Sequence, residues 1–324
     1  MTEVTGVILA GGRGTRLHPV TSDGTPKALV QLFGERTLLS MTRDRLAGVT
    51  DRQLIVTHHA AAELYREHAP DTELLIEPAR RDTGPAVAHA ISTLHARDPD
   101  GVVVITPADH LADEDFTRAL TTAITAATQR DAIVLMGITP TRTATGYGYI
   151  EPATSHTDGI TGVTSFHEKP DRRTAQTLIE QGALWNTGVL VAPVEVLHAA
   201  VCDSPLGEFA AAVRADPSAA YAQAPSVSVD VAVLEKHDDL WVLPTAADWD
   251  DVGSWDAFTR PPARELIESS GPTHLVAAED VTVLSDGPAV SAVGVEDLMI
   301  VAWDDQVLVV DPAAAQRVRS LTDR

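Results

Sequence analysis

The chain has 324 residues, 44% of them hydrophobic but only 4% aromatic, and a formal net charge of −22 at pH 7. That length accommodates one large domain and a smaller one, and the strongly acidic balance argues against non-specific binding to nucleic acids or anionic membranes. A single cysteine, Cys202, excludes an internal disulfide and argues against a cysteine metal cluster.

Neither a targeting segment nor a membrane span is expected. The amino terminus has no basic segment followed by an apolar run, and no stretch approaches the roughly 18 consecutive apolar residues of a membrane helix. We therefore expect a soluble, cytoplasmic protein.

The first predicted element is a short buried strand, Val7–Leu9, that ends at a glycine-rich turn. Because Gly11, Gly12 and Gly14 have no Cβ, backbone N–H groups there can approach an anion closely. Three nearby cations make this segment locally basic within an acidic chain: Arg13, Arg16 and Lys27. The pattern predicts a phosphate-binding loop at the mouth of an α/β sheet.

The spacing differs from the better-known phosphate loops. The Rossmann fingerprint needs a third glycine where this chain has Leu17, and the P-loop's Gly-Lys-Ser/Thr is missing. Glycine content alone leaves a plain turn with a stray arginine as an alternative. The ordered set Leu-Ala-Gly-Gly-x-Gly-x-Arg-Leu, followed by Pro-Lys at 26–27, is more specific. It resembles the signature of the sugar-1-phosphate nucleotidyltransferases.

The resemblance implies that this loop holds a nucleoside triphosphate. Arg16 and the loop amides would bind the β and γ phosphates, and Lys27 would face the α-phosphate. The nucleotide-binding residues implied in this segment are Leu9, Ala10, Gly11, Gly12, Gly14, Thr15, Arg16 and Lys27.

Alternating strands and helices are predicted next from the spacing of apolar residues. The strands are 28–34, 53–57 and 73–77, and the helices are 37–46 and 60–68. His58 and His59 follow the second strand. Adjacent residues point to different faces and no ligand stands four residues on, so we do not expect a metal site there.

The segment that begins at Glu77 reads Glu-Pro-Ala-Arg-Arg-Asp-Thr-Gly-Pro-Ala. A loop with two prolines between a strand and a helix is common in α/β proteins, which is the alternative interpretation of this segment. It resembles the Glu-Pro-x-x-Arg-Asn-Thr-Ala-Pro-Ala segment with which the mannose-1-phosphate guanylyltransferase branch meets its base. Asp82 and Gly84 replace the family asparagine and alanine; a carboxylate can still accept hydrogen bonds from guanine N1–H and N2–H₂. The implied base contacts are Glu77, Asp82, Thr83 and Pro85.

Four consecutive β-branched residues, 102–105, predict a central parallel strand that is buried on both faces. Asp109 follows at its carboxyl end, where open α/β sheets bind ligands. A helix N-cap is the alternative role for this residue. By resemblance, Asp109 is a magnesium ligand beside the nucleotide.

The acceptor half of the site is implied by three further motifs. A strand at 131–138 and a loop at 146–148 precede Phe-His-Glu-Lys-Pro at 166–170 and Trp-Asn-Thr-Gly at 185–188. We expect the segment 184–191 to form strand, turn and strand. A surface Glu–Lys pair is the alternative for the first motif. By resemblance, sugar hydroxyls and phosphate would be held by Gly148, Glu168, Lys169 and Asn186.

Helical patterns follow at 171–180 and 194–224, and a helix start at 228–236 includes Asp230, expected to orient a loop. After a strand at 241–244, Trp249-Asp-Asp-Val-Gly-Ser-Trp matches the family's second magnesium ligand at Asp251, which is also implied at the sugar phosphate. A simple acidic turn is the alternative. Two carboxylates with phosphate oxygens and water form a normal magnesium site.

Pro261-Pro262 and the Ser-Ser-Gly-Pro stretch at 269–272 mark a boundary. We expect a catalytic domain at 1–262 and a small β-rich, β-helix-like domain at 263–324. Its strands are 281–284, 290–295, 298–302 and 307–310, before a terminal helix at Asp311-Pro312. This resembles the tail of the short, single-function guanylyltransferases; we expect no cupin-like isomerase domain. The β domain is the expected contact of a homodimer.

The predicted fold class is α/β: a Rossmann-like nucleotidyltransferase domain with a mixed, mostly parallel sheet, plus the small β domain. The resemblance implies magnesium-dependent transfer from GTP to mannose 1-phosphate, giving GDP-mannose and pyrophosphate. The acceptor phosphate is already anionic, so no general base is needed. Alternatives are another sugar or pseudo-sugar 1-phosphate, such as a heptose or cyclitol phosphate, and a non-catalytic regulatory paralogue. The implied catalytic residues are Arg16, Lys27, Asp109, Lys169 and Asp251.

Overall fold

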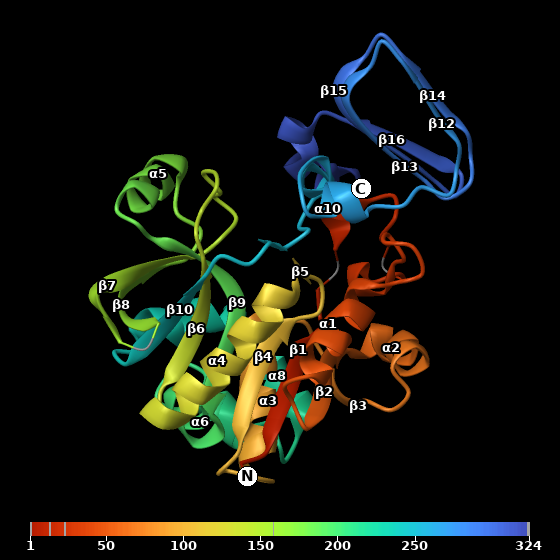
Figure 1. Cartoon of the computed structure of the whole chain (residues 1–324). Coiled ribbons are helices and arrows are strands. Elements are labelled where there is room, and N and C mark those ends of the chain that lie inside the picture. The colour runs from red at the N-terminus through yellow and green to blue at the C-terminus, as the bar shows by residue number, and fades with distance from the viewer. Residues whose placement is uncertain (1, 13, 23, 158, 323–324) are drawn as a thin grey trace. The chain divides into compact units, whose positions relative to one another are not determined.

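The computed structural model describes residues 2–12, 14–22, 24–157 and 159–322 (Figure 1); Arg13 lies outside the described residues. The chain divides into two compact units. The first comprises Met1–Gly11, Asp44–Pro107 and Asp113–Ala247, and the second comprises Gly12–Arg43, Ala108–Ala112 and Asp248–Arg324. The predicted domain boundary at residue 262 is a division along the sequence and stays a prediction.

The first unit is built around a nine-stranded sheet with the strand order β3-β2-β1-β4-β9-β6-β10-β8-β7. All strands except β8 and β9 run in the same direction. The strands are β1 (Val4–Leu9), β2 (Arg52–His58), β3 (Glu73–Glu77), β4 (Val102–Pro107), β6 (Ile133–Ile138), β7 (Tyr149–Thr157), β8 (Ile160–His167), β9 (Leu184–Pro193) and β10 (Leu240–Thr245).

Strand β4 confirms the prediction of a buried central strand. Its β-branched residues Val102–Ile105 are at most 2% exposed, as expected for side chains covered on both faces of a sheet. The strand pairs in parallel with β1 on one side. On the other side its neighbour is β9, which runs antiparallel, so the sheet is mixed as predicted.

Helices of the first unit supply the apolar faces that cover this sheet. Helices α3, α6 and α7 contact one another, and their buried residues share a core with β1, β4 and β9. Helix α4 contacts β4, β6, β9 and β10. The helices are α2 (Ala62–His68), α3 (Thr83–His95), α4 (Glu114–Arg130), α5 (Arg172–Glu180), α6 (Val194–Cys202), α7 (Gly207–Ala212), α8 (Pro217–Gln223) and α9 (Val229–Ala232). The division between the two units falls within a further helix, α1 (Leu38–Ala47).

Two predicted elements are wrong. Residues 28–34 do not form a strand; a short 3-10 helix, Lys27–Leu29, leads into a loop whose apolar residues join the core of the second unit. Residues 184–191 do not turn, because β9 runs unbroken from Leu184 to Pro193. Gly188 has φ +70° inside that strand, where the pairing with β6 changes register.

The second unit has its own apolar core, which includes Leu17, Val252, Trp255 and Phe258. Around it lie 3-10 helices at Thr15–Leu17, Trp255–Thr259 and Pro312–Leu321, helix α10 (Ala263–Leu266) and a two-residue ribbon of β5 (Leu111–Ala112) with β11 (Trp249–Asp250). The remaining strands are β12 (Thr273–Val276), β13 (Glu279–Ser285), β14 (Val290–Val293), β15 (Glu296–Trp303) and β16 (Gln306–Val310). No helix among the described residues is long and apolar enough to span a membrane.

The carboxyl-terminal strands stack as parallel coils. Thr273 pairs with Val290, and Glu279 pairs with Glu296, so both pairs are offset by 17 residues. The corners repeat with the same offset, since Asp280 and Asp297 both have positive φ. A constant offset between parallel strands is the geometry of a β-helix. Asp311 caps the terminal helix, accepting from the Ala313 N–H at 2.8 Å, as predicted.

Candidate active site

One group of predicted site residues lies at the carboxyl edge of the sheet in the first unit. Strands β1, β2, β3 and β4 are parallel. The strands that follow β1 in the chain are added on one side of it, and the strands that follow β4 are added on the other side, so the strand order reverses between β1 and β4. Such a switch point is where open α/β sheets bind ligands. Leu9 ends β1 opposite Pro107 of β4, and Ala10 continues the ladder by donating to the Val56 carbonyl at 2.8 Å.

Glu77 ends β3 as a buried carboxylate that is 4% exposed. The Tyr221 hydroxyl of α8 donates to its Oε1 at 3.2 Å, and His89 Nδ1 of α3 lies 3.5 Å from that hydroxyl. A Cβ built on Gly11 would stand only 2.7 Å from Glu77 Oε2, so any larger residue there would displace the Glu77 carboxylate. Burial raises the pKa of Glu77 to about 7 against the opposing effects of Tyr221 and Arg80.

Asp82 and Thr83 form the amino terminus of α3. The Asp82 carboxylate accepts from the Thr83 N–H at 2.8 Å, and the Thr83 hydroxyl accepts from the Val229 N–H at 3.0 Å. Pro85 occupies the first turn of the helix. Backbone N–H groups at such a terminus favour negative charge. Asp82 therefore serves as a helix cap in this structure.

The predicted acceptor residues form a second cluster in the first unit. Asn186 N–H donates to the Gly148 carbonyl at 2.8 Å, and the Gly148 Cα faces the Glu168 carboxylate. Lys169 Nζ is paired with Glu168 Oε1. Although burial opposes it, this pairing raises the pKa of Lys169, which keeps the ammonium charged. The cluster offers both a cation and hydroxyl-binding groups.

Asp230, expected to orient a loop, lies inside this cluster. Its Oδ1 accepts from Asn186 Nδ2 at 2.9 Å, while Asn186 Oδ1 accepts from the Gly188 N–H. Burial, with Glu168 nearby, raises the pKa of Asp230 to about 6. A cavity of about 70 Å³ lies among these residues. Its lining includes Leu9 and Thr83, which were predicted to bind the nucleotide, and Asn186, which was predicted to bind the sugar phosphate, together with Asp230.

The predicted site residues of the second unit begin with the glycine loop. Gly14 has φ +63°, and a Cβ there would stand 2.7 Å from Lys27 Cβ. Its carbonyl accepts from the Leu17 N–H and from the Thr21 hydroxyl, which closes the loop. Gly12 is exposed, and Thr15 begins the 3-10 helix that carries Arg16.

The β5–β11 ribbon brings the two predicted metal ligands together. Asp250 pairs with Leu111 in antiparallel register, which places Asp251 and Asp109 on adjoining ends of the ribbon. Lys27 Nζ lies 2.8 Å from Asp109 Oδ2 and donates to the Asp251 carbonyl at 2.7 Å. Burial alone would raise the pKa of Asp109, but Lys27 and His110 lower it, so this carboxyl stays ionised.

These oxygens suit a hard divalent cation. Magnesium typically takes one or two protein carboxylates and completes its shell with water and substrate phosphates, and Asp109 and Asp251 supply that number. Among the described residues, no group of three or more histidines, cysteines or carboxylates is arranged around a common metal position. His58 instead accepts from the Ala60 N–H at its Nδ1.

Three of the non-glycine residues with positive φ lie in the predicted motifs. Asp82, Lys169 and Val252 all have positive φ, at 68°, 47° and 47°. Val252, which follows Asp251, is β-branched, and such a residue rarely adopts this conformation. Strained backbone of this kind persists where the surroundings enforce it and clusters at functional sites.

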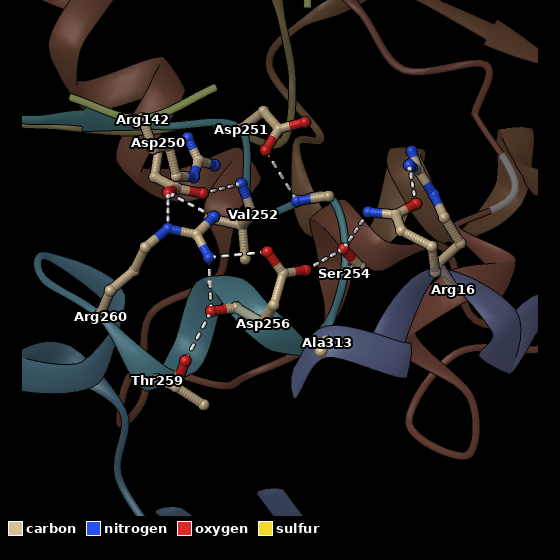
Figure 2. A network of polar contacts seen from close by, with 12 residues as sticks. Arg16, Arg142, Asp250, Asp251, Val252, Ser254, Asp256, Thr259, Arg260 and Ala313 are labelled. Atoms are coloured by element: carbon tan, nitrogen blue, oxygen red, sulfur yellow. Dashed lines mark hydrogen bonds and ion pairs between the residues drawn. The ribbon is translucent and has the colours of Figure 1, made fainter. Parts of the chain in front are cut away.

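The strained turn at Asp251 is held by a polar network (Figure 2). Asp250 Oδ1 accepts from the Val252 N–H at 2.8 Å, and Arg260 Nε donates to Asp250 Oδ2 at 3.2 Å. Arg260 also pairs with Asp256 at 2.8 Å. The bridge between these two carboxylates fixes the turn.

Replacing Arg260 by alanine is expected to lower the free energy of unfolding by about 2 kcal/mol, because the buried Asp250 carboxylate loses its cation. Urea unfolding would measure the change. Arg264→Ala is the matched control, since its ion pair with Asp280 at 3.6 Å is exposed and worth at most about 1 kcal/mol. Equal losses in both variants would contradict the bridging role.

The structure therefore brings together Lys27, Asp109 and Asp251 in one unit, and Gly148, Glu168, Lys169 and Asn186 in the other. Sequence reasoning missed Tyr221 and the position of Asp230. Tyr221 stands 144 residues from Glu77 and belongs to no recognised motif, so the sequence offered no signal for the contact.

Comparisons with known proteins find relatives for both the large amino-terminal region and the small carboxyl-terminal region of the chain. A family model described as nucleotidyl transferase matches residues 5–264, and one described as a MannoseP isomerase/GMP-like β-helix domain matches residues 274–324. Xanthan biosynthesis protein XanB of Xanthomonas campestris pv. campestris is 32% identical, over 100% of this chain and 73% of that protein. A mannose-1-phosphate guanylyltransferase of Klebsiella pneumoniae is 32% identical, over 98% and 73%.

Solved structures give the same picture. The crystal structure of a protein described as mannose-1-phosphate geranyltransferase, from Thermus thermophilus, matches with a TM-score of 0.92 and 30% identity over 100% of this chain and 99% of that one. A UDP-glucose pyrophosphorylase matches at a TM-score of 0.59 with 14% identity, over 80% of this chain and 96% of that one, which is a likeness of fold alone.

Proposed function

The chain belongs to the nucleotidyl transferase family, and on that premise we propose that it transfers the guanylyl group of GTP to mannose 1-phosphate, releasing pyrophosphate. The family match and the guanylyltransferase relatives confirm the predicted resemblance, the two-part fold class and sugar-1-phosphate nucleotidyl transfer as the class of reaction. The choice of GTP and mannose, and the need for magnesium, belong to the proposal.

The nucleotide would be held by residues at the ends of β1 and β3 and by the glycine loop. Glu77 and the α3 terminus would read the base, and loop N–H groups with Arg16 would bind the β and γ phosphates. Lys27 has two acceptors among the described residues, Asp109 and the Asp251 carbonyl. An ammonium has three N–H donors, so one is left for the α-phosphate.

The acceptor would be held by the cluster around Asn186. Lys169 would bind its phosphate, and Glu168 and Asn186 would bind its hydroxyls. Asn186 already donates one Nδ2 hydrogen to Asp230 and accepts at Oδ1, which leaves one hydrogen and one lone pair for a vicinal diol. Asp230 thereby fixes the orientation of the amide.

In the reaction, an anionic phosphate oxygen of the acceptor attacks the α-phosphorus, and the bond from that phosphorus to the bridging oxygen of pyrophosphate breaks. No proton has to be removed from the nucleophile, so catalysis rests on positioning and on neutralising charge. Asp109 and Asp251 would hold magnesium, which supplies further neutralisation of the triphosphate.

The observation that supports this function best is Lys27 in contact with Asp109 and the Asp251 turn. A buried cation that pairs with the carboxylate of Asp109 and binds the main chain at Asp251 suits the charge neutralisation that phosphoryl transfer requires. The test is pyrophosphate release with four nucleoside triphosphates against a panel of sugar and cyclitol 1-phosphates. We expect the highest kcat/KM with GTP and mannose 1-phosphate.

Other outcomes of this screen decide between the alternatives. Preference for a heptose or cyclitol phosphate would overturn the acceptor and keep the reaction. Tight binding of a sugar nucleotide without any turnover would overturn catalysis and favour a regulatory protein. A base other than guanine would overturn the role given to Glu77.

The raised pKa of Glu77 predicts a pH dependence. Only the ionised carboxylate can accept from guanine N1–H and N2–H₂ with both of its oxygens, because the protonated acid turns one O–H donor toward this donor edge. With a pKa of about 7, kcat/KM for GTP should rise with pH through that value. Glu77→Gln does not titrate, so it should flatten the profile and lower kcat/KM roughly tenfold at pH 8. An unchanged profile in this variant would contradict the assignment.

A further inference from the structure

Arg16 of the glycine loop is held by the carboxyl-terminal helix. Its Nη1 donates to Gln316 Oε1 at 3.1 Å. Gln316 lies in the 3-10 helix Pro312–Leu321, whose Ala315 and Val318 are buried in the same apolar core as Leu17. The apolar residues therefore fix the register of this helix, and the register presents Gln316 to the loop.

Donor and acceptor chemistry fixes the orientation of the Gln316 amide. The Ser254 hydroxyl has one hydrogen, and it is donated to the Asp256 carboxylate, which can only accept. Ser254 Oγ must then accept from Gln316 Nε2, at 2.7 Å. The amide oxygen consequently faces Arg16, which can only donate. Arg16, Gln316, Ser254 and Asp256 thus form a relay of hydrogen bonds in which each side chain has one consistent orientation.

The relay continues to the turn that carries Asp251. Asp256 pairs with Arg260, Arg260 bonds to Asp250, and Asp250 accepts from the Val252 N–H (Figure 2). Arg16 is thus connected through the terminal helix to the strained turn of the candidate metal site. All of these groups belong to the second unit.

We propose that Gln316 is a positioning residue of the triphosphate subsite, which holds the Arg16 guanidinium in place without neutralising it. A free arginine side chain loses rotamer entropy when it is fixed, and a pre-formed hydrogen bond lowers that cost at the moment of binding. A carboxylate in this position would compete with the phosphates for Arg16, whereas the amide leaves the charge uncompensated. The proposal rests on the proposed role of Arg16 at the phosphates.

Two substitutions separate positioning from charge. Gln316→Ala should weaken binding of GTP and of inorganic tripolyphosphate about fivefold, by loss of one hydrogen bond to Arg16. Gln316→Glu should weaken both at least about tenfold, because Arg16 becomes ion-paired and, as in Gln316→Ala, the donor to Ser254 Oγ is lost. In turnover assays KM for GTP should rise, while kcat changes less than about twofold and KM for the acceptor stays constant.

The experiment is calorimetric titration of the full chain with inorganic tripolyphosphate and with GTP, both with Mg²⁺. Ser320→Ala is the matched control, since its hydroxyl lies on the same helix and bonds only to the Arg317 carbonyl among the described residues; it should bind like wild type. In an Arg16→Ala background, Gln316→Ala should add no further loss. Urea unfolding of each variant would check the fold.

The possible failures are distinct. If wild type binds neither probe, the proposed function of the loop is wrong, and the role of Gln316 falls with it. If wild type binds both probes and Gln316→Ala binds within twofold of wild type, only the role of Gln316 is wrong. An additive loss in the Arg16→Ala background would likewise overturn it, because Gln316 would then act through another group.

Discussion

Lys27→Met is expected to lower kcat at least about a hundredfold, the size of effect seen when one donor to a developing oxyanion is removed. Lys27 is 5% exposed, and its ammonium contacts Asp109 Oδ2 at 2.8 Å and the Asp251 carbonyl at 2.7 Å. Methionine keeps the length and the apolar stem while removing the charge. The phosphate would then lose its nearest buried cation.

The same substitution also acts on Asp109. Without Lys27, the effect of burial is opposed less strongly, although His110 remains, so the pKa of Asp109 should rise and part of the lost activity should return at higher pH. Steady-state kinetics between pH 6 and pH 9 would measure both effects, with urea unfolding as the check on the fold. Lys236→Met removes an exposed lysine and is the matched control. A kcat within threefold of wild type would rule out the role of Lys27.

The sequence was most informative where the local conformation or burial of a segment is determined by the residue types in that segment alone. The β-branched run at 102–105 could become only a covered strand, and Asp109 stands just past its end, where the prediction placed it. Gly14 sits at positive φ, as expected for a glycine loop. Such features depend on local chemistry, so an isolated motif is sufficient to predict them.

Wrong predictions arose where local pattern and long-range packing disagree. Apart from the exposed Gln31, residues 28–33 are apolar and buried as a strand would be, yet Val30, Leu32 and Phe33 join the core of the second unit without entering a sheet. Gly188 resembles a turn residue, but its positive φ produces an irregularity inside β9. Hydrophobicity reports burial and glycine reports conformational freedom; neither reports which strand is the neighbour.

Part of the site could not be predicted because its contacts join remote segments. The ribbon that places Asp109 beside the Asp251 turn has two residues per strand, too few for any periodicity to reveal. Gln316 meets Arg16 across 300 residues of sequence. Family resemblance gave the identities of Lys27, Asp109 and Asp251, while the side chains that hold them are visible only in the structure.

Asp251→Asn should lower kcat by about a hundredfold or more and raise the Mg²⁺ concentration needed for half-maximal activity at least about tenfold. The substitution isolates the charge of this carboxylate. An amide oxygen can still accept from the Gly253 N–H, which Asp251 Oδ1 now does at 3.1 Å, and the main-chain carbonyl still accepts from Lys27. The turn should therefore persist, and the unfolding free energy should stay within about 1 kcal/mol of wild type.

Titration of activity with Mg²⁺ distinguishes a metal ligand from a residue that merely shapes the turn. Asp248→Asn is the matched control, because it makes the same change of charge three residues away at an exposed position and should leave the Mg²⁺ titration unaltered. A turn-shaping role predicts lower stability together with an unchanged Mg²⁺ midpoint. That combination in Asp251→Asn would remove Asp251 from the metal site and leave Asp109 as its proposed carboxylate, because one protein carboxylate can still hold magnesium against a triphosphate.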